Sequence, residues 1–324
     1  MREPRCLVPN RYQLVAIELQ LTLQFPFYHF DEVIQVKRFV PGLGLWFALG
    51  IWTSVTAFAG DRPYFITYDH TMEEPGNLEV ESSGLTGQPQ GGDMFTSGLL
   101  EFEYGAKGWW TTEFYLDGQT TANQSTIFTG IRWENRFRLL MKEHLINPVF
   151  YIEYEGLSGA DKTIKEVVGF DGQEDGLVPN SIASRDHEHE LETKLILSSN
   201  VGGWNIAENF IAEKNLAGEP WEFGYSAGFS RPLALLASAN ECVLCRENFQ
   251  AGAEFYGGLG TANRFTVHGT SQYAAPLLSW QVHDAMFKIS PTFGLTGESY
   301  RFMLRYGVSY EFSGFGRKVR KLFH

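Results

Sequence analysis

The sequence lacks a basic stripe of the kind that binds nucleic acid. Lysine and arginine number 26 against 38 aspartate and glutamate residues, for a formal net charge of −12. Basic residues gather only in the last few positions of the chain. We therefore expect no nucleic-acid partner. A polar linker run is also absent, so the 324 residues predict one folded unit.

Long apolar runs and catalytic motifs are missing as well. Beyond Gly60 no stretch of 18 or more apolar residues occurs, which excludes a transmembrane helix from that part of the chain. The sequence contains no G-x-S-x-G, no phosphate loop and no dinucleotide fingerprint. His268 and Ser271 are three residues apart and so lie on opposite faces of a regular strand, poorly placed as base and nucleophile. We expect no enzymatic activity and no cofactor.

An export signal is predicted near the N-terminus. Residues 39–60 carry no charge and directly follow a Lys-Arg pair, and the A-x-A sequence ending at Ala59 supplies the small residues that signal peptidase requires. We predict a signal peptide over residues 36–59, cleaved after Ala59, with residues 1–35 untranslated or removed. An uncleaved anchor helix is the alternative, because about 17 apolar or neutral residues reach the lower limit of spanning length.

What the sequence does have is aromatic residues, at 15%. Beyond Gly60, apolar and polar residues alternate with the period of a β-strand. In the last predicted strand one face holds Tyr300, Phe302, Leu304, Tyr306, Val308, Tyr310 and Phe312. The same pattern recurs after Trp221, Phe287, Phe150 and Leu100, with charge on the face opposite the rings. Soluble sheets alternate too, but an exposed face of rings is an aggregation hazard in water and ordinary against lipid.

This pattern predicts an all-β fold, a membrane-spanning antiparallel up-and-down β-barrel of about twelve strands. The predicted strands start near Asn77, Phe95, Trp109, Ser125, Pro148, Glu188, Trp204, Glu219, Asn248, Ser271, Ala285 and Ser299. The barrel covers residues 77–312, after a periplasmic lead-in over residues 60–76 and before a basic periplasmic tail over residues 313–324. Barrels of this kind have short periplasmic turns and longer external loops. Tight glycine turns follow even-numbered predicted strands, and the long connection over residues 158–187 follows an odd-numbered one, which agrees with both termini in the periplasm.

The last predicted strand, Tyr306-Gly307-Val308-Ser309-Tyr310-Glu311-Phe312, resembles the terminal signature of bacterial outer-membrane barrels. That resemblance implies recognition by the barrel-assembly machinery through the strand ending at Phe312, and a setting of outer-membrane lipid and lipopolysaccharide. The tail after Phe312 departs from the signature, which usually ends the protein. From Gly60 to Phe312 the chain is loosely similar to uncharacterised porin-like barrels associated with phenol degradation, and no functional residue carries over from this likeness.

The face opposite the rings predicts a polar lumen. The candidate lumen and transport residues are Glu101, Glu103, Glu113, Arg132, Glu134, Glu153, Glu155, Glu192, Glu222, Glu254, Lys288, Arg301 and Arg305. Carboxylates outnumber bases, so we expect an outer-membrane channel that passes small solutes and prefers cations. A structural or adhesive barrel, plugged by a packed ionic network and acting through its external loop, is the alternative. A lipid-modifying enzyme is the third possibility, because twelve-stranded barrels include a phospholipase.

The remaining candidates are cysteine and histidine side chains. Of three cysteines, Cys6 lies before the predicted signal, which leaves Cys242 and Cys245. With no following histidine for haem attachment and no second C-x-x-C for zinc, we expect a local disulfide in the periplasm. His187 and His189 share one side of a strand and are weak candidates for a shared metal, with a solvated loop edge as the alternative.

Overall fold

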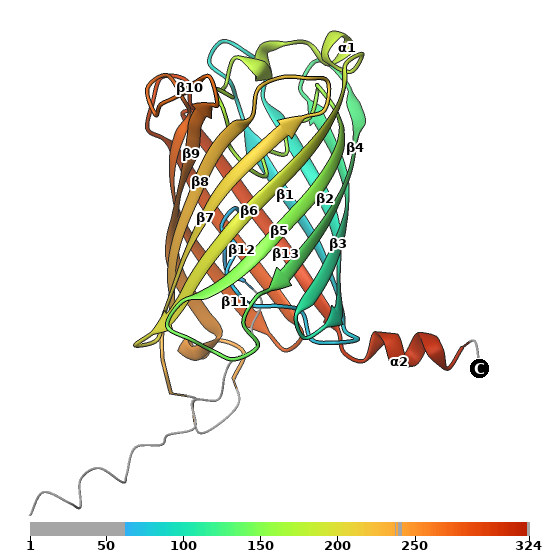
Figure 1. Ribbon diagram of the computed structural model, residues 1–324, viewed down its shortest axis with the longest axis vertical. Helices are drawn as coiled ribbons and strands as arrows, with labels where there is room; N and C mark the ends of the chain where they lie inside the picture. The colour runs from blue at the N-terminus through green and yellow to red at the C-terminus, as the bar shows by residue number, and fades with distance from the viewer. Residues whose placement is uncertain (1–61, 237, 239–241, 323–324) are drawn as a thin grey trace, which may run out of the picture. The chain divides into compact units, whose positions relative to one another are not determined.

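The computed structural model describes residues 62–236, 238 and 242–322, so the predicted signal peptide lies outside the described residues. Alternation of inward and outward side chains produces strands β1 (Leu78–Gly87), β2 (Phe95–Lys107), β3 (Trp110–Thr121), β4 (Thr126–Arg138), β5 (Asn147–Ser158), β6 (His187–Val201), β7 (Trp204–Asn215), β8 (Glu222–Pro232), β9 (Phe249–Thr261), β10 (Arg264–Phe265), β11 (Gln272–Val282), β12 (Ala285–Gly294) and β13 (Phe302–Phe312). Each strand pairs antiparallel with its neighbour, and β13 pairs with β1. Apart from the two-residue β10, the strands form a closed barrel of twelve (Figure 1).

Four short helical turns lie outside the wall, η1 (Asp175–Leu177), α1 (Asn180–Ala183), η2 (Arg246–Asn248) and α2 (Phe315–Arg320). Figure 1 shows α1 and α2 at opposite ends of the barrel. We call the end with α1 the loop end, because the long β5–β6 connection lies there. The other end, where β1 begins and β13 finishes, we call the terminal end. No helix among the described residues is long and apolar enough to cross a membrane.

The twelve-stranded antiparallel barrel predicted from the sequence is confirmed. No observed strand start differs from its prediction by more than three residues, the largest shifts being Glu219 to Glu222 for β8 and Ser299 to Phe302 for β13. One outward assignment was wrong: Tyr300 is only 4% exposed and packs edge-on against Phe95 inside the barrel, with ring centroids 5.6 Å apart. It precedes β13 in a turn, where the alternation of the strand no longer fixes its direction.

The outer surface of the wall is apolar. Side chains such as Phe114, Trp133 and Phe210 point outward and are exposed, whereas their strand neighbours are buried. Rings gather at the terminal end, where Trp109, Trp110 and Phe137 lie together and Phe249 stacks on Trp280. An apolar belt bordered by rings is typical of a barrel that spans a membrane, with the rings at the level of the headgroups.

Two segments that are not strands fold into the barrel. The N-terminal segment, residues 62–77, enters from the terminal end and buries Tyr64, Ile66 and Tyr68. The loop segment, residues 159–186, enters from the loop end and buries Lys165 and Val168. The sequence analysis assigned the first only as a lead-in and the second only as a long connection. Inside the barrel these segments contact the inward side chains that form the candidate site.

Candidate functional site in the barrel lumen

Cross-strand register brings glutamates together across nine strands. The row consists of Glu311, Glu79, Glu103, Glu113, Glu134, Glu153, Glu192, Glu213 and Glu222, each paired with the next across β13 and β1 to β8. Because paired residues lie perpendicular to tilted strands, the row climbs around the wall from the terminal end towards the loop end. We call it the glutamate row. Like charges at directly opposite positions repel, so the row needs neighbouring cations, protons or water.

Arg136 and Arg62 neutralise the first part of the glutamate row. Arg136, fully buried on β4, donates from Nε to Glu113 at 2.7 Å and also contacts Glu103. Arg62 of the N-terminal segment donates to the same Glu103 at 3.2 Å. A guanidinium presents five donors in a plane, which suits it to binding several carboxylates at once. One of the two bases therefore comes from the wall and the other from an inserted segment.

Lys165 and Arg132 neutralise the middle of the row. Lys165 of the loop segment lies 3.0 Å from Glu134 and 2.6 Å from Glu153. Burial alone would lower the pKa of Lys165, but the two carboxylates raise it well above its usual value. Arg132 of β4 lies 2.5 Å from Glu155. These side chains form a connected ionic network that holds the loop segment against the wall.

The loop segment adds a carboxylate of its own to this network. Glu166 accepts from Arg132 at 2.8 Å and lies 3.9 Å from Lys194, which also contacts Glu192 at 2.8 Å. Burial raises the pKa of Glu166, but Arg132, Lys194 and Lys165 more than offset it and hold the pKa at about 2. Glu166 is therefore ionised when the loop segment is docked at neutral pH.

Glu254 fixes the N-terminal segment in place. Its carboxylate is fully buried on β9 and accepts from the backbone N–H groups of Phe65 at 3.1 Å, Ile66 at 2.9 Å and Thr67 at 2.7 Å. An extended segment without a strand partner must satisfy its backbone groups in some other way, and a carboxylate is a strong acceptor. Glu254 thus supplies the hydrogen bonds that a neighbouring strand would otherwise provide.

The two inserted segments meet near Tyr68. Its hydroxyl donates to Glu134 at 3.0 Å, and Asn209 bonds both its backbone N–H and its carbonyl. Arg62 stacks over the Tyr68 ring at 4.2 Å, and Lys165 of the loop segment lies 5.7 Å from the same ring. Inserted chain therefore occupies the middle of the lumen, leaving a cavity of about 90 Å³ beside β1 and β2 and one of about 380 Å³ under the loop segment.

Most of the candidate residues from the sequence face this interior. Those that are buried are Glu101, Glu103, Glu113, Arg132, Glu134, Glu153, Glu155, Glu192, Glu254, Lys288 and Arg305. Lys288 pairs with Glu81 at 2.7 Å, and Arg305 donates to the carbonyl of Ile164. Glu222 is half-buried at the loop end, where it lies close to Gly169. Arg301 differs from the rest because it is exposed and precedes β13.

Several charged residues of the lumen were missed, among them Arg62, Lys165, Glu166 and Glu213. Arg62, Lys165 and Glu166 belong to the inserted segments, where no strand period indicates a direction. The sequence did indicate that Glu213 points inward, because Ile211 and Glu213 alternate with the outward Phe210 on β7. The outward Glu208 on the same strand obscured that pattern.

Metal binding by histidine receives no support from the geometry. His187 and His189 are exposed at the start of β6, and the ring of His189 is stacked on Tyr154 and within 2.8 Å of its hydroxyl. Among the described residues, the acidic groups close enough to share an ion are Glu153, Glu155, Glu166 and Glu192, and Glu101, Glu103 and Glu113. Each group already contacts buried arginine or lysine side chains, which supply positive charge there.

Two serine and histidine pairs bear on catalysis. His268 is exposed, whereas Ser271 is buried and donates to the carbonyl of Asp171 at 2.7 Å, so these two do not form a pair. At the terminal end His70 Nδ1 lies 2.5 Å from Ser198 Oγ, and its Nε2 lies 3.1 Å from Glu143. Ser198 is buried, and its oxygen also accepts the backbone N–H of His70. This second arrangement therefore anchors the N-terminal segment without presenting a nucleophile to a substrate.

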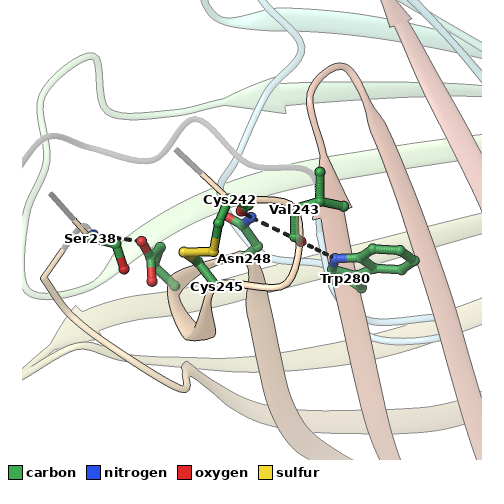
Figure 2. The surroundings of a disulfide bond; sticks show 7 residues. Ser238, Cys242, Val243, Cys245, Asn248 and Trp280 are labelled. Carbon is green, nitrogen blue, oxygen red and sulfur yellow. Dashed lines mark hydrogen bonds between the residues drawn. A yellow bond between two sulfur atoms is a disulfide. The ribbon is translucent and has the colours of Figure 1, made fainter. Parts of the chain in front are cut away.

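Cys242 and Cys245 are joined by a disulfide in the β8–β9 link at the terminal end (Figure 2). The small loop that it closes is held against the barrel. The indole of Trp280 donates to the carbonyl of Val243 at 2.9 Å, and the Asn248 side chain donates to the carbonyl of Cys242 at 2.8 Å. The disulfide lies outside the lumen and takes no part in the ionic network.

Comparison with solved structures agrees with this architecture. The chain is similar to the COG4313 outer membrane channel from Pseudomonas putida F1, with a TM-score of 0.50 and 8% identity over 78% of this chain and 100% of that one. It is also similar to the KdgM porin in complex with disordered oligogalacturonate, with a TM-score of 0.42 and 7% identity over 73% and 99% of the two chains. No family model and no curated protein matches the sequence. The chain therefore shares the fold of that outer membrane channel, a closed antiparallel β-barrel.

Proposed function

We propose that this protein is an outer-membrane channel for the passive passage of small solutes, with a preference for cations. The glutamate row carries the proposal, since it offers carboxylates along the wall from the terminal end to the loop end. Neutralisation is uneven. The part from Glu103 to Glu192 contacts buried bases, whereas no lysine or arginine in the described part of the chain forms an ion pair with Glu213 or Glu222. A narrow lumen of low dielectric focuses such a field and attracts cations.

The outer surface and the topology support a setting in the outer membrane. The apolar belt with rings at the terminal end suits lipid and lipopolysaccharide as neighbours. With an even number of strands, the start of β1 and the end of β13 lie on the same side of the membrane, which we assign to the periplasm, with the loop end outside the cell. Export through a signal cleaved after Ala59, and assembly through the strand ending at Phe312, complete the proposal.

Reversal potentials test the sign of the selectivity. The refolded mature protein is placed in a planar bilayer under a salt gradient, and cations should carry most of the current. Changing Glu190→Gln and Glu222→Gln together, at the loop end, should move the cation-to-anion permeability ratio towards one. Glu208→Gln, on the outer face of β7, is the matched control and should leave the ratio unchanged. A preference for anions in the unmodified protein would contradict the proposal.

A plugged barrel is the second candidate, and the two inserted segments favour it because they meet in the middle of the lumen. Current measured in the same planar bilayer distinguishes the two functions. Heat-modifiable migration in a gel shows that the barrel is folded. A folded barrel that passes no current is plugged, and we then expect its function to depend on contacts made by the loop end. A small but finite conductance identifies the inserted segments as a constriction of the channel.

A further inference from the structure

The cavity under the loop segment, with a volume of about 380 Å³, is strongly acidic. Its carboxylates are Glu155, Asp161, Glu166, Asp171, Asp175, Asp186, Glu188, Glu190 and Glu213, against Arg132 and Lys162 as its bases. Both bases are already engaged. Arg132 lies 2.5 Å from Glu155, and Lys162 donates to the side-chain oxygen of Asn180 at 3.2 Å. The carboxylates that line the cavity therefore outnumber its bases and produce a negative electrostatic potential, which attracts cations.

Glu213 is the clearest sign that this cavity takes a ligand. It points inward from β7, lines the cavity and is 6% exposed. Its neighbours in register are Glu192 on β6 and Glu222 on β8, both carboxylates. Among the residues that the structure describes, none forms a hydrogen bond or ion pair with the Glu213 side chain. A buried carboxylate is tolerated only when it is paired, hydrated or protonated, and a cation bound in the cavity would supply the pair that Glu213 lacks.

The spacing of the carboxylates indicates which kind of cation fits. A metal ion needs ligand atoms that converge on one point at about 2.0–2.6 Å. Glu188, Glu190 and Glu213 belong to neither group of carboxylates whose ligand atoms lie within 4.8 Å of one another. The cavity volume equals about a dozen waters at roughly 30 Å³ each, which is room for a small organic molecule. Separated carboxylates in such a space suit a cation whose positive groups are also separated.

We propose that this cavity binds an organic polyamine, with one ammonium group at Glu213 in its depth and another at Glu188 at its mouth. The polyamine thereby enters the lumen from the loop end. Its role as the entering solute rests on the proposed channel function, whereas the binding itself does not.

Calorimetric titration of the full mature protein in detergent tests the binding, with spermidine as the probe at low salt. We expect saturable binding of spermidine, with Mg²⁺ alone at least tenfold weaker. Glu213→Gln should weaken spermidine binding about tenfold, since it removes a charge-assisted hydrogen bond. Glu188→Gln, at an exposed position at the start of β6, should weaken it by a smaller factor. Glu208→Gln, which faces outward on β7, should bind as the unmodified protein does.

The proposal is overturned if spermidine does not bind saturably, or if Mg²⁺ alone binds as tightly. It is also overturned if heat-modifiable Glu213→Gln and Glu188→Gln proteins bind spermidine as tightly as the unmodified protein. Failure of the channel function gives a different result, because binding is measured without a bilayer. If the barrel binds spermidine but passes no current, the binding site is supported and only the channel function is refuted. If it passes current but does not bind spermidine, only the binding site is refuted.

Discussion

Replacing the single side chain of Glu254 should release the N-terminal segment from the lumen. The buried carboxylate accepts three backbone N–H groups, two of them on Oε1 from Ile66 and Thr67 and one on Oε2 from Phe65. In Glu254→Gln the amide oxygen keeps at most the first pair, and the NH₂ group faces the N–H of Phe65 as a second donor. A hydrogen bond to a charged group contributes about 1.5–3 kcal/mol, so we expect a loss of about 2–3 kcal/mol in docking of the segment.

Hydrogen exchange measures this loss directly. A change of about 2–3 kcal/mol corresponds to a rise of roughly 30- to 150-fold in the open population of the segment, and the amides of residues 65–67 should exchange faster by that factor. Conductance should rise as well, because the released chain vacates the middle of the lumen. Glu208→Gln serves as the control, since that side chain faces outward. Unchanged exchange at residues 65–67 in a folded barrel would refute the assignment of Glu254 as the anchor.

Three further outcomes are expected. Val308→Arg, at a 39% exposed position in the middle of β13, should lower the free energy of unfolding by about 2–4 kcal/mol, whereas Met141→Arg, 65% exposed in a turn, should cost little in the same refolding titration. N-terminal sequencing of the membrane-fraction protein should begin at or near Gly60, and recovery of the first residue of the chain would contradict the predicted signal. Docking of the loop segment should weaken as pH falls from about 5 to about 2, because the folded-state pKa of Glu166 lies below its unfolded value and the stabilisation that it supplies is lost on protonation. Proteolysis of residues 159–186 with an acid-active protease at several pH values follows that change, and a resistance that does not depend on pH would count against it.

The sequence alone determined the wall of the barrel. Lipid favours apolar side chains at the outward positions of each strand, so residues such as Phe102 and Tyr306 indicate their direction locally, without knowledge of the neighbouring strands. Strand number and the inward direction of Glu103, Glu153 and Glu254 followed from the same period. The pattern failed where a strand ends, as at Tyr300, because a turn residue is directed by its contacts and not by alternation.

Only the tertiary structure decided what fills the lumen. The N-terminal segment has no period, and its partners are far away in the chain, since Glu254 follows Phe65 by 189 positions and Asn209 follows Tyr68 by 141. Counting charges along the strands gave the excess of carboxylates but not its distribution, because Lys165 neutralises the middle of the glutamate row from the loop segment. Register, which no single strand contains, placed the glutamates next to one another and left Glu213 without a base, since each cross-strand neighbour is set by the pairing of two separate strands.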